Sequence, residues 1–302
     1  MMWIILAIGV AVVVAVEIAL RRVFGFGTPL LYVADERIGY RLAPNQDVRR
    51  FGNRIVINDY SMRGEAIAPH RSARTLRVLL LGDSIANGGW WTDHDETISA
   101  LLQRQLSSSM SHPEIETVEV LNASANSWGP RNELAYVETY GCFESQLVIL
   151  LINTDDLFAT APTSVQVGRD RNYPAQRPPL AWAEVIGRYL LPSVSIPELD
   201  AVRAEGGDRV GTNLDAIRQI QALVTQQGGT LVLVLTPLLR ELDLRELESS
   251  GSREYEMKAR DRLAAFTQDH QIPYLDMLPI LSRQSDPAML YRDHIHFNPQ
   301  GN

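Results

Sequence analysis

The stretch that decides the fold lies at residues 77–84 and reads RVLLLGDS. Its central residues, 78–81, form an uninterrupted apolar run, which is typical of a β-strand buried on both faces. Gly82 ends the run, and Asp83 and Ser84 follow it directly. Because Asp and Ser are favoured helix caps, the sequence predicts a strand that passes straight into a helix near Ser84.

Four more apolar runs follow along the chain, separated by helix-length amphipathic stretches. The runs lie at 118–121, 147–152, 231–235 and 272–275, and the amphipathic stretches include 132–140, 213–226 and 254–268. This alternation predicts a parallel sheet that is covered by helices on both faces. Because strand crossovers are right-handed, the fold class we expect is α/β, a doubly wound three-layer sandwich.

Ser84 lies directly after the first strand, at the edge of the sheet where such folds bind their ligands. Backbone N–H groups at a helix start can stabilise negative charge beside its hydroxyl. The Gly-Asp-Ser tripeptide alone is consistent with a nucleophile or with a simple helix cap.

The far end of the sequence offers partners for a serine nucleophile. Residues 291–299 read YRDHIHFNP, which places Asp293 three residues before His296. One turn can then present both side chains to the same point, with His296 as the base for Ser84 and Asp293 orienting the imidazole. His294 is an alternative base, but it adjoins Asp293 directly and converges less well. The pattern predicts a Ser-His-Asp triad.

These two motifs resemble the first and last motif blocks of the SGNH/GDSL hydrolase superfamily. Residues 122–127 (NASANS) are similar to its second block, and residues 153–156 (NTDD) to its third block. The resemblance covers residues 76–302. It implies a flavodoxin-like three-layer fold that cleaves an ester, thioester or acetyl ester without a metal or an organic cofactor.

The resemblance also implies a role for each member of the triad. Ser84 is the expected nucleophile, His296 the base and Asp293 its orienting partner. Family members normally continue beyond the last block into a closing helix, whereas this sequence ends at Asn302. The resemblance therefore predicts a truncated sequence or a missing helix.

Two positions depart from the family pattern at the expected oxyanion hole. The second block normally offers the N–H of a glycine, and Ser127 holds that place. The third block normally supplies an asparagine side chain, but the matching residue is Asp155, whose ionised carboxylate cannot donate. The expected donors are the N–H groups of Ser84 and Ser127, with a protonated Asp155 or the nearby Asn153 as a further donor.

Three functions are compatible with these motifs. We expect a serine esterase; an O-acyltransferase acting on a glycan and a non-catalytic binding protein are the alternatives. Trp90 and Trp91 lie within seven residues of Ser84 and can wall an acyl pocket, stack on a sugar ring or simply pack a loop. Residues 158–208 form a long proline-rich insertion that is suited to shaping a substrate site.

The N-terminus predicts a single-pass membrane anchor. Residues 3–20 are apolar except for Glu17, and at about 1.5 Å per residue they span about 27 Å, enough to cross a hydrocarbon core. A cleaved signal peptide is the alternative, although no basic leading segment is evident. The arginines near the span all follow it, so the positive-inside rule favours a cytoplasmic catalytic domain.

Composition narrows the range of partners. The net charge is −8, and nucleic-acid binding, which requires clustered Lys and Arg, is therefore not expected. The single cysteine, Cys142, allows no intrachain disulfide. We expect an anchor at 1–22, a β-rich collar without catalytic residues at 23–75, and the hydrolase domain at 76–302.

Overall fold

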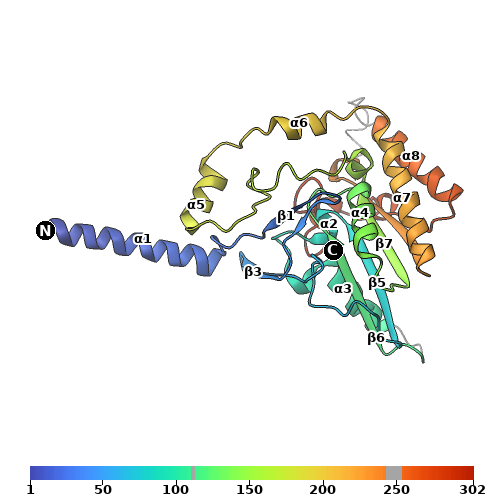
Figure 1. The fold of residues 1–302 in the computed structure, drawn as a ribbon, viewed down its shortest axis with the longest axis horizontal. Coiled ribbons are helices and arrows are strands. Elements are labelled where there is room, and N and C mark those ends of the chain that lie inside the picture. The colour runs from blue at the N-terminus through green and yellow to red at the C-terminus, as the bar shows by residue number, and fades with distance from the viewer. Residues whose placement is uncertain (110–112, 243–253) are drawn as a thin grey trace.

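Five parallel strands form the central sheet of the computed structural model, which describes residues 1–109, 113–242 and 254–302. They are β5 (Thr75–Gly82), β6 (Thr117–Ser124), β7 (Leu147–Asn153), β8 (Thr230–Thr236) and β9 (Tyr274–Asp276). Their order across the sheet is β6-β5-β7-β8-β9 (Figure 1). The predicted doubly wound parallel sheet is confirmed, and its topological switch point lies between β5 and β7.

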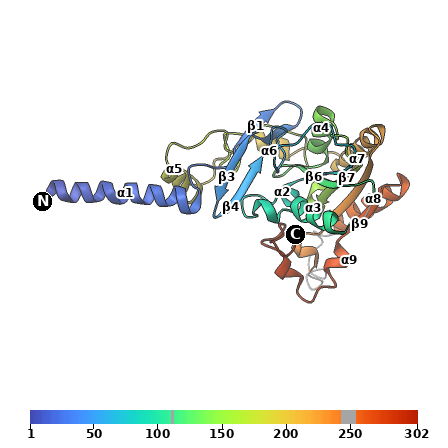
Figure 2. The same cartoon turned by 90° about the horizontal axis from the view of Figure 1, so that it is seen from below.

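Alternate residues of β5 face two different layers. Leu79 and Leu81 pack into a core with α4 (Pro130–Tyr140), α7 (Arg209–Gln226) and α8 (Glu254–Asp269). Leu80 faces a second core, formed with α2 (Ser84–Asn87), α3 (Ile98–Ser109) and α9 (Leu278–Leu281). Figure 2 shows these two groups of helices on opposite sides of the sheet. Burial on both faces explains why the strand is apolar at every position from 78 to 81.

The predicted strands agree with the structure to within a few residues. The fifth was expected from residue 272 but begins at Tyr274. Pro273 precedes it and has no N–H to donate to the ladder, although its carbonyl accepts the N–H of Leu233 at 2.9 Å. Short 3₁₀ turns complete the described elements: η1 (His94–Glu96), η2 (Thr154–Phe158), η4 (Leu239–Leu242) and η6 (Pro287–Leu290).

The N-terminal helix α1 (Met2–Phe24) projects from the body of the protein, and none of its residues is buried (Figure 1). Its mean hydropathy of 2.7 and its 23 residues suit a membrane span or a signal sequence. Two antiparallel hairpins follow, β1 (Tyr32–Asp35) with β2 (Gly39–Leu42) and β3 (Gln46–Arg50) with β4 (Asn53–Ile57). Their apolar side chains join the same core as Leu79.

Residues 158–208 run along the outside of the molecule between β7 and α7. They reach the end of α1 at α5 (Ala181–Val185), continue into the π-helical turn η3 (Ile186–Leu190) and return through α6 (Pro197–Arg203) (Figure 1). The insertion therefore connects the carboxyl edge of the sheet with the base of the N-terminal helix.

We predict that Gly82→Ala destabilises the protein. A Cβ at Gly82 would lie 2.6 Å from the carbonyl oxygen of Leu151 and 2.8 Å from the Cβ of Ala86. Overpacking of this kind costs about 1–3 kcal/mol of unfolding free energy, which thermal unfolding of the full chain in detergent micelles would detect. Gly64→Ala is the control, because a Cβ there meets nothing within 4 Å. Equal losses of stability in the two variants would contradict the packing argument.

Candidate active site

Ser84 stands at the turn from β5 into α2. Asp83 caps this one-turn helix, because its Oδ1 accepts the N–H of Ile85 at 2.8 Å. The helix ends at Gly88, whose φ of 75° is in the left-handed region. The strand and the two caps together fix the backbone of Ser84 at the carboxyl edge of the sheet, beside the switch point.

Ser84, His296 and Asp293 form one chain of hydrogen bonds, although 212 residues separate the first two. The Nε2 of His296 lies 2.9 Å from the Oγ of Ser84. Its Nδ1 lies 2.9 Å from Oδ2 and 3.0 Å from Oδ1 of Asp293. His294, the alternative base, lines the same pocket, but the contact with the serine hydroxyl comes from His296.

The carboxylate of Asp293 is held within its own turn. Its Oδ1 accepts the N–H groups of Ile295 and His296 at 3.1 and 2.9 Å. Partial burial acts to raise the pKa of Asp293, but these hydrogen bonds and the imidazole together lower it more, so the pKa lies below its ordinary value. The group is ionised at neutral pH and can stabilise a positive charge on His296.

Trp90 and Trp91 wall the pocket beside the triad. The ring of Trp91 lies 4.5 Å from the imidazole of His296, measured between centroids. The guanidinium of Arg292 lies 4.8 Å from the Trp90 ring and 4.9 Å from the Trp91 ring. Trp91 therefore packs against one side of the imidazole, and both tryptophans present aromatic surface to the pocket.

The collar holds the loop that carries these tryptophans. The buried guanidinium of Arg63 donates to the backbone carbonyls of Asn87, Gly89 and Thr92 at 3.2, 2.6 and 2.7 Å. Desolvation by burial lowers the pKa of Arg63 to about 10, so the group is still a cation at neutral pH. Sequence reasoning found no functional residue in the collar, because a single arginine in an irregular segment carries no periodic signal.

Ser127 brings a second backbone donor to the pocket. Its φ of 58° is in the left-handed region, where glycine is the usual residue. Among the described residues, the N–H groups of Ser84 and Ser127 donate to no acceptor. Both residues line the pocket, so two backbone donors are free to bind a substrate oxygen.

Three tyrosines form the wall next to Ser127. The hydroxyl of Tyr173, from the insertion, donates to the Oγ of Ser127 at 2.9 Å. The Tyr173 ring packs against Tyr32 and Tyr40 of the collar, at centroid distances of 5.0 and 5.1 Å. The hydroxyl of Tyr40 donates to the carbonyl of Asn126 at 2.5 Å. Collar and insertion thus meet at the second motif, a contact that the sequence analysis missed.

Asn153 and Asp155, at the carboxyl end of β7, are both engaged by other residues. The Nδ2 of Asn153 donates to Asp83 at 3.0 Å and to Asp156 at 2.8 Å, which uses both of its hydrogens. The half-exposed carboxylate of Asp155 lies 3.3 Å from the guanidinium of Arg240. Both residues line the pocket, but in this arrangement neither side chain has a free donor for a substrate oxygen.

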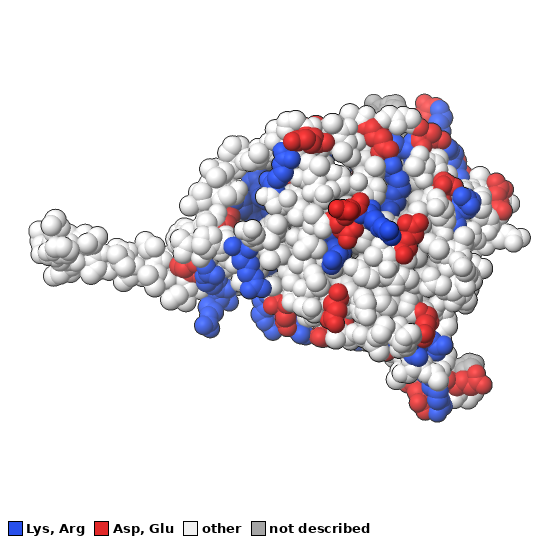
Figure 3. All heavy atoms as spheres, viewed as in Figure 1, with Lys and Arg blue, Asp and Glu red and all other residues white. Residues whose placement is uncertain are grey.

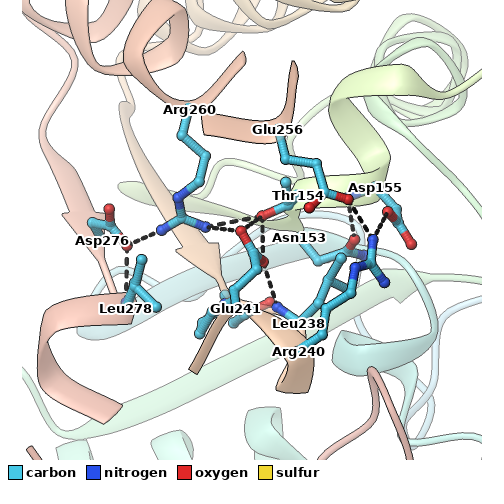
Figure 4. A network of polar contacts seen from close by, with 12 residues as sticks. Asn153, Thr154, Asp155, Leu238, Arg240, Glu241, Glu256, Arg260, Asp276 and Leu278 are labelled. Carbon is cyan, nitrogen blue, oxygen red and sulfur yellow. Dashed lines mark hydrogen bonds and ion pairs between the residues drawn. The ribbon is translucent and has the colours of Figure 1, made fainter. Parts of the chain in front are cut away.

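Arg240 connects Asp155 to a wider polar network at the ends of β7, β8 and β9 (Figure 4). Its guanidinium also contacts the buried carboxylate of Glu256 at 2.5 Å. Beside it, Arg260 pairs with Glu241 at 3.3 Å. Arg260 also pairs with Asp276 at 2.5 Å. The Thr154 hydroxyl donates to Glu241 at 2.8 Å. The network fixes the loop that carries Asp155 against α8.

Three buried carboxyl groups lie beneath the nucleophile. Desolvation by burial raises the pKa of Asp83 to about 6, and raises the pKa of Asp156 and Glu133 well above their ordinary values. Neither carboxyl oxygen of Glu133 has a hydrogen-bond partner among the described residues. Among those residues, no group of three or more His, Cys, Asp or Glu side chains is arranged to hold a metal ion.

These elements enclose a pocket of about 650 Å³ with Ser84 and His296 in its wall. Every residue that the sequence analysis selected for the site lines it, except Asp293, which lies behind the imidazole. Further parts of the wall come from the collar, including residues 28–30, and from the insertion, including Arg188. A pocket of this volume accommodates a small organic substrate.

The sequence model of the GDSL-like Lipase/Acylhydrolase family matches residues 80–302. The chain belongs to this family and, as a member, is a serine esterase or acylhydrolase. A sequence search of the curated proteins finds no match.

Several solved structures are similar in outline. A GDSL-like lipase from Bacteroides thetaiotaomicron VPI-5482 is 10% identical, with 78% of this chain and 85% of that chain covered and a TM-score of 0.43. The psychrotrophic esterase EstA from Pseudoalteromonas sp. is 14% identical (75% and 90% covered, TM-score 0.41). A lipase/acylhydrolase from Enterococcus faecalis is 15% identical (74% and 88% covered, TM-score 0.40). At these low scores, family membership rests on the sequence match.

We predict that Glu133→Gln stabilises the protein increasingly as the pH rises. The pKa of Glu133 is raised in the folded state, so this state keeps the proton at pH values where the unfolded state has lost it. The unfolding free energy of the wild type therefore has its full value below the pKa of the unfolded state and decreases as the pH rises above that pKa. Glutamine cannot ionise, so the gain in melting temperature over wild type should grow between about pH 5 and pH 8.

The matched control is Glu138→Gln, an exposed position on the same helix. Its melting temperature should track that of the wild type across the pH range. A Glu133→Gln difference that does not change with pH would show that the buried group is ionised or that its charge is compensated.

Proposed function

We propose that the protein is a membrane-anchored serine esterase that cleaves a carboxylic ester, acetyl esters included, through Ser84, His296 and Asp293. One observation carries the proposal. The Nε2 of His296 lies 2.9 Å from the Ser84 hydroxyl, while its other ring nitrogen contacts Asp293. This arrangement leaves a lone pair of the imidazole aimed at the proton that has to be removed.

The proposed reaction has two halves. Ser84 attacks the acyl carbon while His296 takes the hydroxyl proton, and Asp293 stabilises the imidazolium. His296 then gives this proton to the leaving alcohol as the C–O bond breaks, which leaves the acyl group on the serine. In the second half, His296 removes a proton from water as the water attacks the acyl-serine. His296 then returns this proton to the Ser84 oxygen as the bond to the acyl group breaks, which releases the acid.

The proposed oxyanion hole consists of the N–H groups of Ser84 and Ser127. Both are free of acceptors among the described residues, and both lie in the pocket. Asn153 is left out because its amide already bonds Asp83 and Asp156. Asp155 is left out because its carboxyl group is paired with Arg240.

We further propose that α1 anchors the protein in a membrane as a single span, with residues 1–22 as the anchor, 23–75 as the collar and 76–302 as the catalytic domain. The helix is apolar and has no buried residue, which suits a lipid environment. A cleaved signal peptide would leave a mature chain that lacks these residues, and mass spectrometry of the membrane fraction distinguishes the two.

We predict that Ser84→Ala lowers kcat/KM for p-nitrophenyl acetate by about 10⁴-fold or more, because it removes the nucleophile of a cooperative triad. The variant should also lose covalent labelling by a fluorophosphonate, detected by intact mass. The control is Ser282→Ala, whose hydroxyl is exposed and donates only to the carbonyl of Leu278.

Equal turnover by wild type and Ser84→Ala would contradict the proposed triad. Wild-type labelling without turnover would point to a binding protein that keeps the reactive serine. If an acylated sugar forms in place of free acid when a glycan acceptor is added, the reaction is acyl transfer.

We predict that Asp155→Asn raises kcat/KM for a neutral ester. A carboxylate in the pocket wall disfavours a developing oxyanion, and one side-chain donor in such a site contributes about 10²–10³-fold. Asp155→Ala removes the charge without adding a donor. A higher kcat/KM for Asp155→Asn than for Asp155→Ala therefore measures the effect of the donor, and a higher kcat/KM for Asp155→Ala than for the wild type measures the effect of removing the charge. A loss of activity in both variants would show that the pairing with Arg240 is required.

A further inference from the structure

The only charged residue within the apolar stretch of α1 has a specific partner in the insertion. The carboxylate of Glu17 accepts the N–H groups of Ala181 and Trp182 at 2.9 and 3.2 Å, and it also pairs with Arg21 at 2.6 Å. These two N–H groups belong to the first turn of α5, where a helix has no acceptors of its own. Glu17 therefore binds α5 to the side of α1.

A second carboxylate fixes the same segment to the collar. Glu184 of α5 accepts the N–H of Gly27 at 2.7 Å and pairs with Arg50 at 2.6 Å. Both members of this ion pair are buried. Two independent attachments thus hold α5 and η3 beside the last turns of α1, as Figures 1 and 2 both show.

The attachment at Glu17 also sets the level of α5 along α1. Glu17 lies seven residues before Phe24, the last residue of the helix, which corresponds to about 10 Å. In a chain anchored by α1, α5 and η3 then lie at the depth where the hydrocarbon core meets the headgroups. Figure 3 shows the same boundary, because the projecting part of α1 has no charged side chains and arginine side chains gather where the helix meets the body.

At this level the insertion exposes an apolar surface, which we call the α5 patch. It consists of Leu180, Ile186, Tyr189, Leu190, Leu191 and Val194, each more than two fifths exposed and Leu190 and Val194 about three quarters exposed. Tyr189 also packs edge-on against Phe26, just beyond the end of α1. Short helical segments with apolar and aromatic residues beside a span are typical of the membrane interface.

We propose that the α5 patch is a second membrane contact, inserted in the lipid interface beside α1. Contiguous apolar surface is unfavourable in water, and the nearest apolar phase is the bilayer that the adjoining helix enters. The pocket wall includes Arg188 of η3 and residues 28–30 just after α1, so docking of the patch holds that side of the pocket at the membrane surface. The proposal rests on the anchor proposed above and does not depend on ester turnover.

The test places spin labels on the full chain in phosphatidylcholine nanodiscs. Leu190→Cys reports on the patch, Val10→Cys on the middle of α1, and Met289→Cys on an exposed apolar position elsewhere. The native Cys142 is buried, so labelled wild type serves as the blank. Collision rates with oxygen, which concentrates in lipid, and with a water-soluble nickel chelate are measured by electron paramagnetic resonance.

We expect the labels at 10 and 190 to collide more often with oxygen and the label at 289 with the nickel chelate. A label at 190 that behaves like the one at 289, while position 10 is lipid-exposed, overturns the patch proposal and leaves the anchor intact. Water exposure at both 10 and 190 overturns the anchor and the patch together. Fluorophosphonate labelling of the same samples reports separately on the catalytic serine.

Discussion

The geometry of the site depends on the close approach of β5 and β7 at their carboxyl ends. Gly82 and Leu151 are register partners there, and the lack of a side chain on Gly82 lets the two backbones meet. The residues just beyond this contact are consequently near each other, and Asn153 donates to Asp83 at 3.0 Å. This hydrogen bond joins the first and third motifs across the switch point and orients the cap that holds Ser84.

The close approach of β5 and β7 also has an electrostatic consequence. A carboxylate buried at the centre of a fold requires donors, and Asp83 obtains them from the N–H of Ile85 and the amide of Asn153. Asn153 is thereby occupied in supporting the nucleophile and is lost as an oxyanion donor. Asp155, two residues on, lies outside this buried cluster and pairs with Arg240. Its side chain is half-exposed, whereas the neighbouring Asp83 and Asp156 are buried.

Much of this fold could be predicted from the sequence because its signals are local. The run at 78–81 identifies a buried strand without reference to the rest of the chain, and the spacing of Asp293 and His296 fits one turn. The contacts of Tyr173 and Arg63 could not be predicted in the same way. Each joins segments that are tens of residues apart, and neither belongs to a periodic pattern or a recognisable motif.

The collar and the insertion are accordingly more than a spacer between α1 and the sheet. Arg63 holds the tryptophan loop on one side of Ser84, and Tyr173 meets Ser127 on the other, so both walls of the pocket depend on segments outside the four motif blocks. The insertion is in turn attached to α1 through Glu17 and to Gly27 and Arg50 of the collar through Glu184. The ion pair between Glu184 and Arg50 is buried, so a shift of α5 away from the collar would leave both charges without a partner, which costs several kcal/mol. The insertion that forms one wall of the pocket is therefore attached both to the collar, through Glu184, and to the N-terminal helix, through Glu17.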